Sequence, residues 1–125
     1  MTPEGKVVAR IKEVVKMAHG EVRKCQWVGH VGAPDLFVML PHHVHTWFEV
    51  KAPGEKPKPH QVREHEKMEK AGCSVYVVAR ASDVARILLN ELMCWRTSYS
   101  KQYIAEALIE ARRLMLKREA EDERA

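Results

Sequence analysis

The chain has 125 residues, of which 46% are hydrophobic and 30% are charged, and this composition suits one globular domain and excludes a disordered chain. No apolar run approaches the ~20 residues that a membrane-spanning helix needs, and the N-terminus lacks a signal-peptide pattern. The net charge of +4 is compatible with a polyanionic partner but does not require one.

The three cysteines fit neither a disulfide framework nor a zinc spacing, because they are odd in number and far apart: Cys25, Cys73 and Cys94. Reduced thiols are therefore expected. Together with the absence of a membrane segment, this pattern predicts a cytoplasmic protein without a membrane partner.

Apolar periodicity and chain breakers predict an alternation of helices and strands. The first helix begins at Thr2-Pro3, an N-cap followed by proline at the first helical position, and runs to about Ala18. The apolar run at 74–79 is typical of a strand buried on both faces. The further predicted elements are strands at 22–28, 35–40, 46–51 and 74–79, and helices from about 59 to 71, from a cap at Ser82 or Asp83 to about 93, and from about 100 to 121.

This order predicts an α/β fold, in which helices flank a mixed central sheet. Residues 35–40 and 46–51 form a hairpin around a turn at 41–45. Residues 1–98 are interpreted as one domain and residues 99–125 as a C-terminal helical extension of it. The apolar stripe of that last helix either packs on its own domain or forms a subunit interface, and the sequence leaves both open.

The strand at 46–51 ends in charges that need an explanation. Successive side chains of a strand point to opposite faces, so Trp47, Glu49 and Lys51 share one face, with Glu49 and Lys51 roughly 6–7 Å apart. Asp35 opens the neighbouring strand at the same end of the hairpin. Two carboxylates and the backbone carbonyl of Val50 suit Mg²⁺, while Lys51 can orient a water or hold a phosphate oxygen. These are the parts of a phosphodiester hydrolase.

Four stretches resemble the VRR-NUC branch of the PD-(D/E)xK nuclease superfamily, which is found in phage-encoded stand-alone proteins and in a Fanconi-associated repair nuclease. They are "GAPD" (32–35), "FEVKAPG" (48–54), Gln61 and "AGCSVYVVA" (71–79), and the resemblance covers residues 3–80. It implies a restriction-endonuclease-like αβββαβ core, to which this chain adds C-terminal helices. It also implies Asp35 and Glu49 as ligands of Mg²⁺ or Mn²⁺, Lys51 as the catalytic lysine, and Gln61 beside that lysine.

The family usually adds an acidic residue from the first helix, and two glutamates compete for that role. At ~100° per residue, Glu4 lies within about 60° of Val8, Ile11 and Val15, on the stripe that meets the sheet. Glu13 points about 180° away from Glu4. Glu4 is therefore the chosen catalytic acid and third metal ligand. The alternative for Glu4 is an ordinary first-turn acid that the helix dipole favours.

Basic residues near the motif are candidates for DNA phosphate contacts, although each equally suits a solvated charge. Trp27 and Trp47 are expected to pack in the core or hairpin rather than to stack on bases. A zinc site at His42, His43 and His45 is less favoured than a solvated turn. The phosphate-contact candidates are Arg23, Lys24, His30, Lys56 and Lys58.

The function expected from these features is a metal-dependent nuclease that cuts structured DNA, such as branches, flaps or Holliday junctions, in DNA repair. A homodimer is expected because one site hydrolyses one phosphodiester bond at a time, and two-fold symmetry matches symmetric junctions. The setting would be a bacterial or phage-infected cell. Two alternatives remain: a non-catalytic nucleic-acid-binding module in a recombination or packaging complex and, more weakly, a metal-binding regulator.

Overall fold

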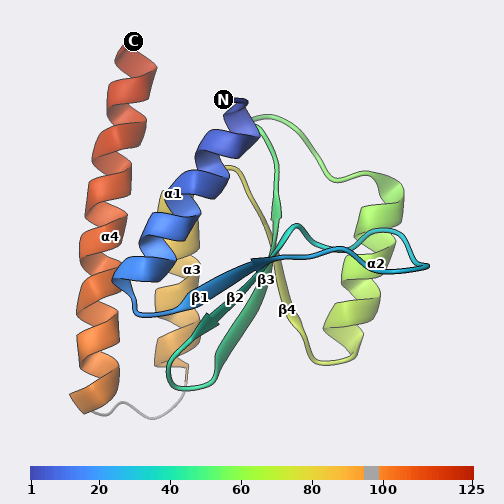
Figure 1. Cartoon of the computed structure of the whole chain (residues 1–125), viewed down its shortest axis with the longest axis horizontal. Helices are drawn as coiled ribbons and strands as arrows, with labels where there is room; N and C mark the ends of the chain where they lie inside the picture. The colour runs from blue at the N-terminus through green and yellow to red at the C-terminus, as the bar shows by residue number, and fades with distance from the viewer. Residues whose placement is uncertain (95–98) are drawn as a thin grey trace.

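The computed structural model describes residues 1–94 and 99–125, with only the backbone described at 99 and 100. Within these residues the chain forms a four-stranded sheet flanked by four helices (Figure 1). In chain order the elements are α1 (Pro3–Met17), β1 (Glu21–Lys24), β2 (Leu36–Leu40), β3 (Val44–Val50), α2 (Pro59–Lys70), β4 (Ser74–Val78), α3 (Ala81–Met93) and α4 (Tyr99–Arg124). This is the expected αβββαβ order followed by extra C-terminal helices.

The sheet is mixed, as the sequence predicts. Its strand order is β1-β2-β3-β4, with antiparallel pairing from β1 to β3 and parallel pairing of β3 with β4. The register places Leu36 of β2 opposite Phe48 of β3. Helices α1, α3 and α4 lie on one side of the sheet, and α2, which connects β3 to β4, lies on the other side (Figure 1). The side chains of β3 therefore face different layers in alternation.

Helix α1 is delimited by residues that the sequence identifies. The Thr2 hydroxyl accepts a hydrogen bond from the Gly5 N–H at 3.0 Å, and Pro3 follows it at the start of the helix. The chain then turns tightly into β1 at Gly20. A Cβ atom there would lie only 2.5 Å from the Met39 carbonyl oxygen, so only glycine fits this approach.

The apolar core lies between the sheet and the three helices on its α1 side. Phe48 is its largest fully buried side chain. The apolar stripe of α4 is part of the same core and packs on its own domain, which settles the alternative that the sequence leaves open for these residues. The stripe consists of Ile104, Ala105, Leu108, Ala111 and Met115.

Two strand boundaries differ from the prediction. β1 ends at Lys24 rather than at Val28, because the chain leaves the sheet there and crosses to α2. β3 begins at Val44, so the turn is shorter than predicted, and His42 and His43 make it with positive φ angles of 68° and 64°. Both changes concern how the strands end, and the pairing of the hairpin is as expected.

The prediction that β4 is buried on both faces is wrong. β4 is an edge strand, and Val77 is 44% exposed. Helix α3 begins at Ala81 with Arg80 as its N-cap, so the predicted cap at Ser82 or Asp83 is wrong. Ser82 is instead a buried side chain that hydrogen-bonds to Glu119 of α4. The predicted domain boundary at 98/99 lies at the edge of residues 95–98, which are outside the described part of the chain, and it stays a prediction. No helix in residues 1–94 or 99–125 combines the length and the apolar character that crossing a bilayer requires.

Candidate active site

Asp35 is held at the end of the hairpin by backbone hydrogen bonds on both sides. It directly precedes β2, and the register that pairs Leu36 with Phe48 brings it opposite Glu49. Its Oδ2 accepts a hydrogen bond from the Val50 N–H at 2.7 Å, and its carbonyl accepts one from the Cys25 N–H at 2.8 Å. The carboxylate is therefore fixed to β3 at the point that the sequence motif predicts.

Glu49 and Lys51 lie together on the face of β3 that meets α2. The Lys51 Nζ is 3.7 Å from the Glu49 Oε2, and both side chains are largely buried, with Lys51 12% exposed. This proximity follows from strand alternation, which places residues i and i+2 on the same face. The structure thus brings together Asp35, Glu49 and Lys51.

The electrostatics of Glu49 are unfavourable for its ionised form. Burial, followed by the neighbouring Asp35 carboxylate, raises the pKa of Glu49 to about 8, although Lys51 acts in the opposite direction. Within the described part of the chain, the buried Glu49 Oε1 has no hydrogen-bond partner. A carboxylate that is buried, crowded by a second acid and incompletely paired is stabilised by a cation. The donor set therefore fits a hard divalent ion, with Asp35, Glu49 and the carbonyl of Val50 as the residues that would hold it.

His65 of α2 belongs to this cluster, although the sequence assigned it no role. It is 6% exposed, and its Nε2 lies 3.5 Å from the Glu49 Oε1. Burial lowers the pKa of His65 and favours its neutral form. The sequence feature that could have identified His65 is its spacing, because it lies one turn after Gln61 on the same face of the helix.

A cavity of about 440 Å³ opens beside Asp35 and carries both acids and bases. Glu4 and Val50 line it, although Glu4 itself is exposed. Glu13 instead pairs with Arg118 of α4. The basic residues that line the cavity are Lys12, Arg23 and Lys24, of which Lys12 was not predicted.

The three predicted acids do not form one cluster. Among residues 1–94 and 99–125, no three His, Cys, Asp or Glu side chains come close enough together to hold a metal ion. Asp35 and Glu49 are neighbours, whereas Glu4 stays exposed in the first turn of α1. The same result applies to His42, His43 and His45, which form no metal-binding group with other side chains in the described residues. The role of Glu4 as a ligand stays a prediction.

Gln61 uses its side chain to cap α2. Its Oε1 accepts a hydrogen bond from the Lys58 N–H at 2.8 Å, which is the arrangement of an ordinary polar helix start. Its predicted position beside the catalytic lysine is not tested by this contact and stays a prediction. Lys56 and Lys58, in the loop before α2, are exposed and available to a polyanion.

The loop between β1 and β2 is tethered to α2 by one glutamate. The Glu64 Oε2 accepts a hydrogen bond from the Trp27 Nε1 at 2.6 Å, and its Oε1 lies 3.0 Å from the His30 Nε2. The His30 contact holds the pKa of Glu64 below its usual range. Gly32 fits closely against the same helix, where a Cβ atom would lie 2.8 Å from the His60 carbonyl oxygen. Trp27 and His30 therefore anchor this loop.

The remaining predicted contacts are on the surface or within the hairpin. Arg23 is exposed and pairs with Glu21 at 3.1 Å. Trp47 packs on Phe37 across the hairpin, with ring centroids 4.3 Å apart, as expected for a packing role.

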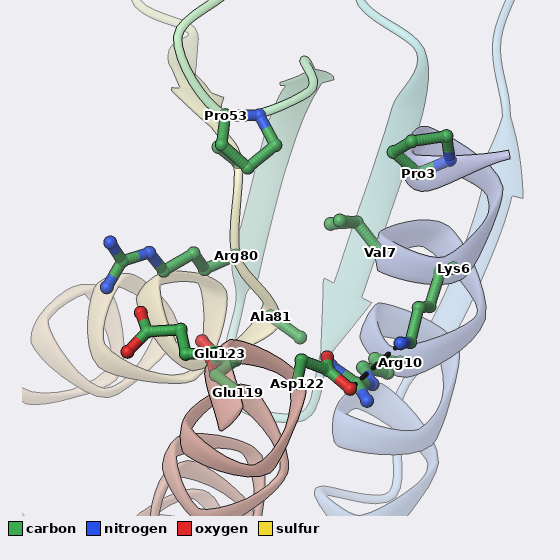
Figure 2. Close-up of a pocket in the computed structure, with 11 residues that line it drawn as sticks. Pro3, Lys6, Val7, Arg10, Pro53, Arg80, Ala81, Glu119, Asp122 and Glu123 are labelled. Atoms are coloured by element: carbon green, nitrogen blue, oxygen red, sulfur yellow. Dashed lines mark hydrogen bonds and ion pairs between the residues drawn. The ribbon is translucent and has the colours of Figure 1, made fainter. Parts of the chain in front are cut away.

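A second cavity, of about 350 Å³, lies where α1 meets the end of α4. Figure 2 shows Asp122 of α4 pointing toward Lys6 and Arg10 of α1. Asp122 pairs with the Lys6 Nζ at 2.9 Å and with the Arg10 Nη1 at 2.7 Å. These cations already have an acidic partner, so the cavity is less suited to an anion than the one beside Asp35.

Comparison with known proteins finds similar proteins, whereas no protein-family model matches the chain. A solved structure described as a "VRR_NUC domain" is 43% identical and superposes with a TM-score of 0.66, over 70% of this chain and 96% of that one. A protein of Acyrthosiphon pisum secondary endosymbiont phage 1, named "Putative nuclease p44", is 43% identical over 60 residues. That match spans 48% of this chain and 63% of the phage protein, which is less than two thirds of its length. The structural likeness confirms the expected fold.

Proposed function

The chain belongs to the VRR-NUC family, and on that premise we propose that it is a metal-dependent nuclease that hydrolyses phosphodiester bonds in structured DNA. One observation carries the proposal: Asp35 and the buried Glu49 are neighbouring carboxylates beside Lys51, and Asp35 also lines a cavity with basic residues on its wall. A hydrolase of this kind needs acids for a cation, an amine near the reacting water and positive charge for the phosphate backbone.

The residues of this chain divide that work by position. A bound Mg²⁺ or Mn²⁺ would supply charge stabilisation and a more acidic water. Asp35 is oriented by the Val50 N–H, and Glu49 is presented by β3. Lys51, a compact cation with three donors, holds a water or a phosphate oxygen next to Glu49.

The DNA backbone would enter along the cavity beside Asp35. Arg23 and Lys24 line this cavity together with Lys12, and Glu4 reaches it from α1 as the proposed further acid. Lys56 and Lys58 extend the positive surface from the loop before α2. Such contacts position a duplex without reading its sequence.

Selectivity for branched, flapped or junction-like DNA is part of the proposal, and so is a homodimer. The name of the phage relative supports a nuclease, over the part of that protein that matches. The compartment proposed is the cytoplasm of a bacterial or phage-infected cell, with DNA repair as the setting. Light scattering tests the dimer separately, since a monomer at working concentration would remove that part of the proposal and leave the chemistry untouched.

The direct test is cleavage of branched, flapped and linear DNA by the pure protein in Mg²⁺, in Mn²⁺ and in EDTA. Substitutions Asp35→Asn, Glu49→Gln and Lys51→Ala should each reduce cleavage at least roughly hundredfold, because such groups act as a unit. Lys117→Ala, at an exposed position of α4, is the matched loss of one positive charge and should leave cleavage unchanged. Equal cleavage by Lys51→Ala, or cleavage that persists in EDTA, would contradict the proposal.

A non-catalytic nucleic-acid-binding module is the second candidate, and the exposed position of Glu4 is the observation in its favour. Within the described residues Glu4 does not join Asp35 and Glu49 in one cluster. Tight, salt-dependent binding of structured DNA without cleavage in any metal would select this candidate.

A further inference from the structure

Two buried polar atoms face each other at the centre of the site without a complete hydrogen bond. They are the Glu49 Oε1 and the His65 Nε2, which lie 3.5 Å apart. In the part of the chain that the structure describes, each lacks any other hydrogen-bond partner. Buried polar atoms almost always have a hydrogen-bond partner in folded proteins. Two such atoms that lack a partner and lie 3.5 Å apart therefore indicate a hydrogen bond between them that a small movement would complete.

Both side chains are held in place by regular structure. Glu49 is on the α2 face of β3, because the strand alternates and Phe48 and Val50 point to the opposite, apolar face. His65 shares the buried face of α2 with Met68, three residues later. The contact is therefore made by a strand and a helix rather than by loops.

The two oxygens of Glu49 have different neighbours. The Oε1 faces His65 at 3.5 Å, whereas the Oε2 faces Lys51 at 3.7 Å. A hydrogen bond from the imidazole to the Oε1 would fix the rotation of the carboxylate. It would thereby determine which oxygen is presented toward Lys51.

We propose that His65 is a positioning residue, whose Nε2–H donates to the Glu49 Oε1 and orients this carboxylate to bind the divalent cation. The inference rests on the proposed function, in which Glu49 is a metal ligand. Removal of a residue that hydrogen-bonds to a metal ligand, without itself touching the metal, typically changes metal affinity by about 10–100-fold. His65 touches neither the cation nor the DNA in this role, so its effect passes through Glu49.

The test is calorimetric titration of the metal-free protein with Mn²⁺, at one pH, for the parent and three variants. His65→Leu removes the donor and should weaken Mn²⁺ binding by about tenfold or more. His65→Gln keeps an N–H at nearly the same reach and should retain affinity within about threefold of the parent. Met68→Leu, on the same buried helix face, is the matched packing control and should bind as the parent does.

A second measurement separates positioning from general damage to the fold. The Mn²⁺ concentration that gives half-maximal cleavage should rise in His65→Leu, while kcat at saturating Mn²⁺ changes much less. Should His65→Leu fail to fold, His65→Asn replaces it, because its amide is one methylene too short to reach the Glu49 Oε1. His65→Asn should then bind weakly where His65→Gln binds well.

The failures are distinguishable. If the parent binds Mn²⁺ and His65→Leu or, in its place, His65→Asn binds equally tightly, the positioning role is wrong and the proposed function stands. If His65→Gln loses as much affinity as the variant without the donor, the hydrogen bond is not the cause and the inference is again wrong. If the folded parent binds no Mn²⁺ at all, the proposed metal-dependent function and this inference fall together.

Discussion

The two faces of β3 are both buried near the end of the strand, at Phe48 and Val50 on one face and at Glu49 on the other, but they differ in what they bury. Phe48 and Val50 point into the core beneath α1 and α3, where almost every neighbour is apolar. Glu49 and Lys51 alternate with them and point toward α2, where an acid, an amine and an imidazole share a small space. One strand therefore stabilises the fold with one set of side chains and holds the candidate site with the other. The difference shows that burial alone does not reveal whether a residue supports stability or chemistry.

The largest expected effect tests the core face. Phe48→Ala should reduce the free energy of unfolding by about 3–5 kcal/mol, because it leaves a cavity at the most buried aromatic position. Trp47→Ala on the other face should cost less, since Trp47 is partly exposed and packs mainly on Phe37. Urea denaturation followed by circular dichroism measures both changes. A larger loss for Trp47→Ala would reverse the assignment of the two faces.

The burial of Glu49 on the site face should make the free energy of unfolding depend on pH. The folded-state pKa of Glu49, about 8, lies above the ordinary value of 4.5, so between these pH values the folded protein retains a proton that the unfolded chain has lost. The metal-free protein should therefore lose stability as pH rises from about 4.5 to about 8, by on the order of 4 kcal/mol from this group.

The control for that prediction is a divalent ion. Mn²⁺ binds the ionised carboxylate and should offset the loss at pH 8, which the midpoint of urea unfolding with and without the ion would reveal. A metal-free protein whose stability rises over this pH range, after the shared background has been subtracted with Glu49→Gln, would show that Glu49 is not destabilised by its surroundings.

The parts of this comparison that the sequence predicts are those set by local rules. Strand alternation places Glu49 and Lys51 on one face, and the short hairpin places Asp35 opposite Glu49, so this cluster follows from a few neighbouring residues. The mixed sheet follows from the order of the elements. These features need no knowledge of how distant segments pack.

The features that the sequence misses depend on long-range packing. His65 faces Glu49 only because of how α2 is rotated on the sheet. The early end of β1 depends on Trp27 reaching Glu64, 37 positions further along the chain. The exposure of Val77 depends on β4 being at the edge of the sheet, and an apolar run reads the same in an edge strand as in a central one.

A smaller effect should show that the ionised Glu49 on the site face lowers the stability of the metal-free protein. Glu49→Gln should raise the free energy of unfolding of the metal-free protein at pH 8 by about 1–3 kcal/mol, because a neutral amide avoids the burial of a charge beside Asp35. The same variant should lose Mn²⁺ binding and cleavage. Measuring stability and binding on one preparation tests both, and a variant that is less stable at pH 8 would contradict the interpretation.

The smallest expected effect concerns the one polar side chain that β3 directs toward the core. Thr46 is fully buried, and among the described residues its hydroxyl has no hydrogen-bond partner. Thr46→Val keeps the shape and removes the unpaired group, so it should be neutral or stabilise the protein by up to about 1 kcal/mol. Unlike Glu49→Gln, it should leave Mn²⁺ affinity unchanged, because Thr46 points away from the site. A clear loss of stability in urea unfolding would mean that the hydroxyl is paired, for example with a buried water, and that the core face also contains a polar network.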